Sequence, residues 1–132
     1  MASIRKEIDV DASPAVVWAA IRDVGAAHIR LFPGILSDVK LEADVRIATF
    51  ANGLIVREPI VSIDDAAKRF AWAAVGGRAT HYGASLQVLP RGTGSRVVWI
   101  ADFLPNEIAE SIEGLMNAGS AAMKAALEGT TP

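Results

Sequence analysis

Arg46, Glu58 and Tyr82 are among the few side chains of this sequence that could act on a small molecule or hold it. Arg46 and Glu58 lie in neighbouring β-rich segments on either side of an Asn-Gly turn, and Tyr82 is the only tyrosine. A carboxylate can move a proton, whereas an arginine or a phenol can stabilise a developing enolate. The structural alternatives are an ion pair at the rim of a sheet and a core tyrosine with a satisfied hydroxyl.

Whether Arg46 meets Glu58 depends on the length of the turn that separates them. A two-residue loop places the two charged residues on opposite faces of the hairpin. A three-residue loop, which starts one residue earlier at Ala51, places Arg46 directly opposite Glu58. In that register the pair could orient a polar end of a ligand or act as a structural ion pair.

His81 and Asp102 form a second candidate pair, because their positions in the last expected hairpin put both side chains on the same face of the sheet. Inside a cavity such a pair is an acid/base candidate. On the outer face of a sheet it contributes only about 0–1 kcal/mol. Alternation along the strand points Tyr82 inward and His81 outward, which favours the surface interpretation.

The composition excludes several kinds of chemistry. The chain has no cysteine and only two histidines, so thiol nucleophiles, disulfides, cysteine-ligated zinc and a three-histidine metal centre are excluded. We therefore expect no metal and no cofactor. The 13 basic and 15 acidic residues form no basic run, which argues against nucleic acid as a partner. No stretch approaches the ~18 apolar residues of a membrane span. We expect the protein to be cytoplasmic. We also expect it to be a monomer or a homodimer.

The 132 residues predict one domain, 1–132, of the α+β class. Ile4–Val10 alternates like an edge strand, Ser13 can cap a helix that begins at Pro14, and a second short helix runs through Ala26 to Leu31. Six further strands follow with short, antiparallel connections. They are expected at Ser37–Leu41, Val45–Phe50, Leu54–Asp64, Phe70–Val75, Thr80–Leu89 and Arg96–Phe103.

Helical periodicity returns after Leu104-Pro105, with Asn106 as a candidate cap. About 22 residues at 1.5 Å each give a helix of roughly 33 Å, long enough to cross a small sheet. Gly119 lies on the inward stripe of this helix, where a missing side chain allows a close approach or leaves space.

The order of these segments resembles one known group. The opening IDVDASPAVVWAAIRDV, the central VRIATFANGLIVREPIVSIDD, the hairpin YGASLQVLPRGTGSRVVWIADFLP and the helical LMNAGSAAMKAALE are similar to the polyketide cyclase/dehydrase and lipid-transport branch of the START/Bet v 1-like (SRPBCC, helix-grip) superfamily. The resemblance implies a seven-stranded curved antiparallel sheet wrapped around a long C-terminal helix, with two short helices after strand 1. It also favours the register that pairs Arg46 with Glu58, because the family has an arginine before this turn and a glutamate five residues after its glycine.

The resemblance further implies a deep cavity for a flat or elongated apolar molecule. Small residues expected on inward faces, namely Ala84, Ala101, Ala122 and Ala126, remove volume where a packed sheet needs larger side chains. Glu58 and Arg46 would supply polar contacts to the ligand. The other expected ligand-binding residues are Tyr82, Trp99, Phe103, Trp72, Leu86 and Met116.

Three functions fit these expectations. The first is binding or transport of a small hydrophobic or aromatic ligand. The second is a polyketide cyclase/dehydratase-like enzyme acting on an aromatic or polyketide carbonyl compound, in which Glu58 or His81 moves protons and Tyr82 or Arg46 stabilises an enolate. The third is a stress-response interaction module whose cavity is incidental. The superfamily does not decide among them, because one fold hosts many functions.

Overall fold

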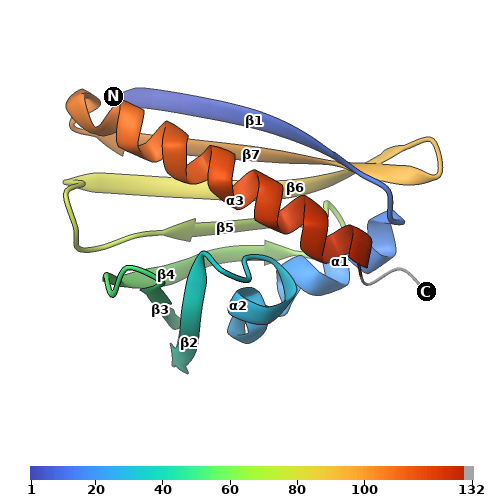
Figure 1. The fold of residues 1–132 in the computed structure, drawn as a ribbon, viewed down its shortest axis with the longest axis horizontal. Helices are drawn as coiled ribbons and strands as arrows, with labels where there is room; N and C mark the ends of the chain where they lie inside the picture. Colours follow the sequence, from blue (N-terminus) through green and yellow to red (C-terminus); the bar gives the residue numbers. More distant parts are fainter. Residues whose placement is uncertain (130–132) are drawn as a thin grey trace.

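The computed structural model describes residues 1–129. Seven antiparallel strands form one curved sheet in the order β1-β7-β6-β5-β4-β3-β2, and the long helix α3 lies across its inner face (Figure 1). The strands are β1 (Ala2–Val10), β2 (Leu36–Glu42), β3 (Val45–Phe50), β4 (Ile55–Asp64), β5 (Arg69–Ala73), β6 (His81–Arg91) and β7 (Gly94–Leu104). The helical segments are α1 (Pro14–Arg22), η1 (Val24–Ala26), α2 (Ala27–Arg30), η2 (Asn106–Ile108) and α3 (Ala109–Gly129). The expected α+β, helix-grip fold is confirmed.

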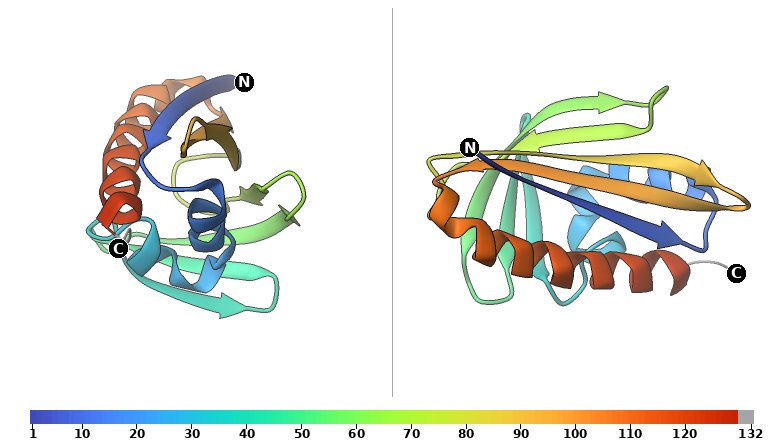
Figure 2. Two further views of the ribbon diagram at one scale, coloured as in Figure 1. Left: turned by 90° about the vertical axis from the view of Figure 1, so that its right-hand side faces the viewer. Right: turned by 90° about the horizontal axis from the view of Figure 1, so that it is seen from above.

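The sheet curls around the helices rather than lying flat (Figure 2). Irregular register interrupts β2 between Leu36 and Asp38 and β4 between Ile60 and Ser62. Such bulges bend a strand and increase its twist. The curvature leaves a concave side on which α3, α1 and α2 all pack.

Local sequence signals explain where α1 begins and where α2 ends. The Val16 amide donates a hydrogen bond of 3.3 Å to Ser13 Oγ, and Pro14 occupies the first turn, where its missing N–H costs nothing. After α2 the chain turns at Gly34, whose φ of 84° favours glycine. The expected cap at Ser13 is therefore confirmed.

Helix α3 begins differently from the sequence expectation. Asn106 does not cap it, because a short 3₁₀ turn, η2, starts at Asn106 and precedes α3. Pro105 is the N-cap residue of η2, and no side chain caps this turn. The turn directs the chain from the C-terminal end of β7 onto the inner face of the sheet.

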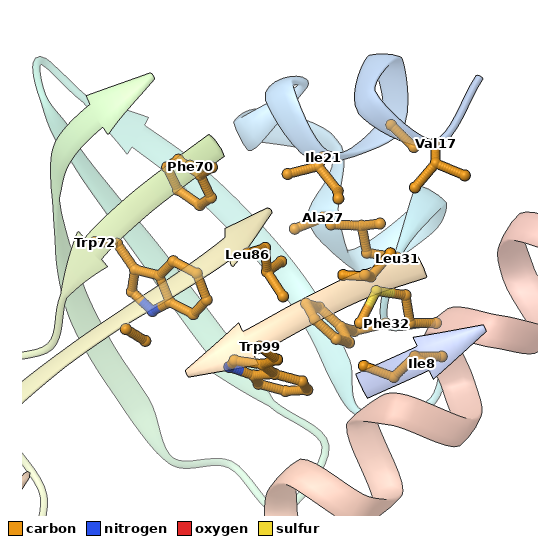
Figure 3. Packing of buried hydrophobic residues seen from close by; sticks show 14 of the residues in the cluster. Ile8, Val17, Ile21, Ala27, Leu31, Phe32, Phe70, Trp72, Leu86 and Trp99 are labelled. Atoms are coloured by element: carbon orange, nitrogen blue, oxygen red, sulfur yellow. The ribbon is translucent and has the colours of Figure 1, made fainter. Parts of the chain in front are cut away.

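Apolar side chains fill the half of the concave space beneath α1 and α2 (Figure 3). Val17 and Ile21 of α1 are fully buried, and Leu31 and Phe32 after α2 pack towards Trp99 in the same cluster. This packed half anchors the short helices on the sheet.

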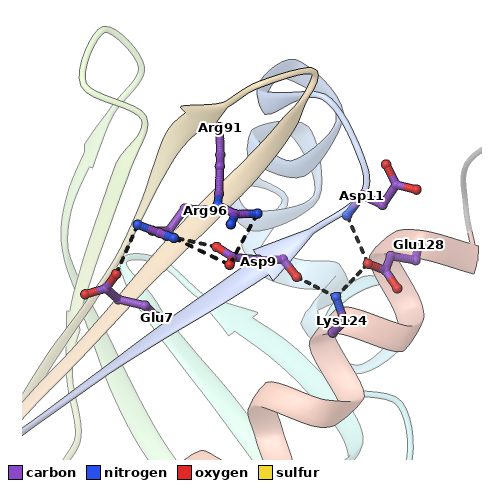
Figure 4. Close-up of polar contacts among 7 residues, drawn as sticks. All are labelled: Glu7, Asp9, Asp11, Arg91, Arg96, Lys124 and Glu128. Carbon is purple, nitrogen blue, oxygen red and sulfur yellow. Dashed lines mark hydrogen bonds and ion pairs between the residues drawn. The ribbon is translucent and has the colours of Figure 1, made fainter.

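Polar contacts fix the C-terminal end of α3 to strand β1 (Figure 4). Lys124 Nζ donates to the carbonyl oxygen of Asp9 at 2.6 Å and lies 2.8 Å from Glu128 Oε2. The amide of Asp11 donates to the same Glu128 oxygen at 2.9 Å. The Asp9 carboxylate accepts from Arg96 of β7, so β1, β7 and α3 are tied together at this end.

Candidate functional site

A cavity of about 470 Å³ lies between the sheet and α3, on the side of the sheet that β3, β4 and β5 form. This volume is within the roughly 300–1,000 Å³ of small-molecule sites. Its mouth is formed by the β3–β4 turn, the β5–β6 loop and the first turns of α3. The lining residues are Phe32, Ile35, Leu36, Arg46, Phe50, Asn52, Leu54, Val56, Glu58, Trp72, Ala74, Gly76, Gly77, Arg78, Ala79, Tyr82, Trp99, Ile108, Ser111, Ile112, Leu115 and Gly119.

Arg46 and Glu58 form a buried ion pair in the wall of this cavity. They are direct partners across β3 and β4, as the three-residue loop requires. Arg46 Nε donates to Glu58 Oε1 at 2.7 Å, and the two side chains are only 4% and 11% exposed. The pairing register is confirmed, and the ion pair lies inside the molecule and not at the sheet rim.

Two aromatic rings hold the guanidinium of Arg46 in place. Its central carbon lies 5.2 Å from the ring centroid of Phe70 and 5.7 Å from that of Trp72, and these two rings stack with centroids 5.1 Å apart. A guanidinium at this distance from an aromatic face is attracted to the ring quadrupole. Arg46 is therefore balanced by one carboxylate and two aromatic faces.

Burial controls the protonation of both cavity-facing acids. Burial raises the pKa of Glu58, while the charge and hydrogen bond of Arg46 oppose the rise. Burial, and next the nearby Glu58 carboxylate, raise the pKa of the Tyr82 phenol far above its ordinary value. The phenol is consequently neutral at physiological pH and can donate a hydrogen bond.

Glu58 and Tyr82 face each other across an alanine. The bridge between Arg57 and Val75 places Glu58 opposite Ala74, and the Ala74 amide donates to the Tyr82 carbonyl at 3.1 Å. Two strand spacings of about 4.8 Å each separate the two backbones by about 10 Å. Because Ala74 carries only a methyl group, the space between the carboxylate and the phenol belongs to the cavity.

Trp99 presents an unpaired donor in the same wall. Its ring lies 5.6 Å from that of Phe32, centroid to centroid, and against the backbone of Gly119. Its side-chain nitrogen Nε1 is buried and has no hydrogen-bond partner among the described residues. A buried unpaired donor costs about 1–3 kcal/mol, and an acceptor that reached this indole nitrogen would offset that cost.

Five of the eight predicted ligand-binding residues line the cavity: Arg46, Glu58, Trp72, Tyr82 and Trp99. Their contact with a ligand stays a prediction.

Phe103, Leu86 and Met116 lie elsewhere, at 0–1% exposure in the packed core. They point to the concave side as expected, but neighbouring side chains cover them. Leu86, for example, lies among residues of α1 and α2 in Figure 3.

His81 does not take part in the cavity. Its side chain is exposed, and Gly83 rather than His81 lies opposite Asp102. The Asp102 carboxylate instead accepts a hydrogen bond from Ser3 Oγ at 2.6 Å. The interpretation of His81 and Asp102 as an acid/base pair inside a cavity is therefore wrong, because strand alternation turns both outward. Among residues 1–129, no group of three acidic or histidine side chains could hold a metal ion.

The residues that create room differ from the expected ones. Ala84 and Ala101 are buried in the core and do not line the cavity, and Ala122 and Ala126 are also absent from its wall. The small residues that do line the cavity are Ala74, Gly76, Gly77, Ala79, Ser111 and Gly119. The sequence did contain a signal for Ala74: it lies two residues after Trp72, so strand alternation places both side chains on the same, inner face of the sheet.

The curled sheet, the long helix and the internal cavity define a helix-grip protein of the Bet v 1-like (SRPBCC) superfamily. Residues 1–130 match the family model described as polyketide cyclase / dehydrase and lipid transport, and the chain belongs to that family. No curated protein matches the chain in sequence. No helix within residues 1–129 is long and apolar enough to cross a membrane.

Solved structures share the whole fold at low sequence identity. The protein XoxI from Bacillus cereus superposes with a TM-score of 0.86 at 21% identity, over 96% of each chain. A Thermobifida fusca protein gives 0.80 at 28% identity, over 97% of this chain and 91% of that one. Norcoclaurine synthase from Thalictrum flavum gives 0.74 at 23% identity, over 97% of this chain and 84% of that one. These similarities establish the architecture.

Proposed function

We propose that the chain binds and carries one small apolar or aromatic molecule in the cavity between the sheet and α3. The observation that carries this proposal is a space of about 470 Å³ walled mainly by apolar side chains, with a few polar groups at its buried end. Small-molecule sites combine these two features. The cavity is built from one chain, so a monomer and each copy of a homodimer would bind alike. The cysteine-free sequence fits the reducing cytoplasm.

Native mass spectrometry of freshly purified protein tests this proposal. We expect a fraction of the protein to carry one small molecule, which collisional activation releases as a single species. Protein without a bound molecule, which also fails to take up the apolar probe N-phenyl-1-naphthylamine, would contradict it.

A second candidate is an enzyme of the cyclase or dehydratase type. It is favoured by the placement of a carboxylate, Glu58, and a neutral phenol, Tyr82, on either side of one cavity space. Glu58 would take a proton next to a carbonyl, and Tyr82 would donate a hydrogen bond to the resulting enolate. A structural relative, norcoclaurine synthase, is a synthase by name.

Proton exchange tests this second candidate without knowledge of the substrate. The α-protons of 2-tetralone, an aromatic ketone, would exchange with deuterium oxide faster than in buffer, and Glu58→Gln would abolish the excess. Exchange at the buffer rate, or an excess that Glu58→Gln leaves unchanged, would contradict it.

A further inference from the structure

Polar groups at the mouth of the cavity are paired with each other. Arg78 Nη1 donates to Ser111 Oγ at 3.2 Å, which joins the β5–β6 loop to α3. Asn52 Oδ1 accepts from the amide of Leu54 at 3.0 Å within its own turn. The other mouth residues on α3, such as Ile112 and Leu115, are apolar. The mouth therefore offers a ligand mainly apolar contacts.

Polar groups at the buried end are only partly paired. Glu58 uses Oε1 to accept from Arg46, and its second oxygen has no hydrogen bond within residues 1–129. Trp99 Nε1 is buried without a partner in this same range. Tyr82 contributes a phenol that stays neutral. Glu58 and Tyr82 lie in one row across the sheet, whereas Trp99 lies four residues along β7 from Phe103, the partner of Tyr82. One ligand group can therefore meet a free carboxylate oxygen and a phenol that can donate or accept.

Charge at the buried end is already balanced. Arg46 is paired with Glu58 at 2.7 Å and held between two aromatic faces, and each side chain is about nine-tenths buried or more. A ligand carboxylate would compete with Glu58 for Arg46 and leave one buried negative charge uncompensated. A buried unpaired charge costs several kcal/mol. The site consequently discriminates against a charged group and accepts an uncharged one.

From this arrangement, and resting on the proposed binding function, we propose that the cavity takes an amphipathic ligand head first, with an uncharged hydroxyl-bearing end against Glu58 and Tyr82. The hydroxyl donates to Glu58 and accepts from Tyr82. The apolar body of the ligand lies along Ile112 and Leu115 towards the mouth.

Three probes with one body and different ends test this proposal. 4-Heptylphenol has a neutral hydroxyl, 4-heptylbenzoate a carboxylate, and heptylbenzene no polar end. Each is titrated against protein loaded with N-phenyl-1-naphthylamine, and its displacement is followed by fluorescence. We expect 4-heptylphenol to bind about fivefold more tightly than heptylbenzene and at least about tenfold more tightly than 4-heptylbenzoate.

The same probes separate failure of this inference from failure of the binding function. If heptylbenzene and 4-heptylphenol bind equally well, the binding function stands and the head-first inference is overturned. Tighter binding of 4-heptylbenzoate than of 4-heptylphenol overturns it as well. If none of the three binds, the proposed function itself fails.

Variants locate the hydroxyl within the cavity. The measured quantity is the ratio of the affinities for 4-heptylphenol and heptylbenzene within one variant, so a general loss of affinity cancels. Tyr82→Phe lowers this ratio about fivefold, because it removes the donor to the hydroxyl. Trp18→Phe is the matched control, since Trp18 Nε1 donates to Asp65 at 2.9 Å outside the cavity. An unchanged ratio in Tyr82→Phe overturns the placement.

Glu58→Gln should shift the preference of the cavity from the neutral 4-heptylphenol towards the charged 4-heptylbenzoate. The glutamine keeps the shape of the side chain but leaves Arg46 without its counter-charge. We expect the affinity for 4-heptylbenzoate relative to 4-heptylphenol to rise at least about tenfold. No rise, in a variant that still binds heptylbenzene, contradicts the argument from charge balance.

Discussion

A methyl group at Gly119 tests how closely α3 approaches the sheet. A Cβ built at this position lies 2.9 Å from Trp99 Cη2, 3.0 Å from Trp99 Cζ3 and 3.5 Å from Phe32 Cε1. The Trp99 ring is packed against Phe32, so it has to retreat into the cavity or α3 has to move away. Such overpacking costs about 1–3 kcal/mol. Alanine gains about 1 kcal/mol over glycine in a helix, so Gly119→Ala changes the free energy of unfolding by about −2 to 0 kcal/mol.

Gly114→Ala is the matched control in the same helix. A Cβ at Gly114 has no heavy atom within 4 Å, so only the helix propensity changes and the variant gains about 1 kcal/mol. The propensity term cancels between the two variants, and their difference of about 1–3 kcal/mol isolates the contact with Trp99. Urea unfolding followed by circular dichroism measures it. If Gly119→Ala stabilises the protein as much as Gly114→Ala, the reasoning about this contact is refuted.

Other predictions concern charge and hydrogen bonding. Arg46→Met leaves the buried Glu58 without its counter-charge, so that Glu58 must either stay ionised and unpaired or take up a proton. Urea unfolding at pH 7 should show a loss of about 3–5 kcal/mol; an unchanged stability would show that the pair is dispensable. The hydrogen bond from Arg96 lowers the pKa of Asp9 below its ordinary 3.8. The ionised Asp9 carboxylate therefore stabilises the folded protein above that pH, and this contribution is lost as the pH falls below it. Asp9→Asn should flatten the acid limb of stability against pH, whereas an unaltered limb argues against this linkage. Ser95→Ala removes a buried hydrogen bond of 2.7 Å to a backbone carbonyl and should lower the thermal midpoint through a loss of about 1–3 kcal/mol.

Most of the fold could be predicted from the sequence because its signals are local. Strand alternation and turn residues place every strand boundary within two residues of the observed one, and Ser13-Pro14 marks the start of α1. The start of α3 was misread, because η2 is a short turn whose geometry depends on how the chain leaves β7. Asn106 has the right side chain for a cap, yet it lies inside that turn.

The site could be predicted only in part, because cavity walls depend on packing between distant elements. Alternation identified the inner faces correctly, including Tyr82 and Trp72. It could not tell which inner residues α1 and α2 cover, so Leu86 was assigned to the cavity although it lies in the core. The register of Arg46 and Glu58 depended on a single residue in the turn, and only a family pattern favoured the correct choice.

Titration with N-phenyl-1-naphthylamine, a neutral apolar probe, tests the central claim that the space between the sheet and α3 binds an apolar molecule. Ala74→Leu fills this space with a larger side chain, while Ala73→Leu places the same side chain on the other face of β5. We predict saturable binding of one probe per chain to the unchanged protein and to Ala73→Leu, with affinity at least about tenfold weaker in Ala74→Leu. Equal binding by all three proteins, or binding by none of them, would contradict the claim.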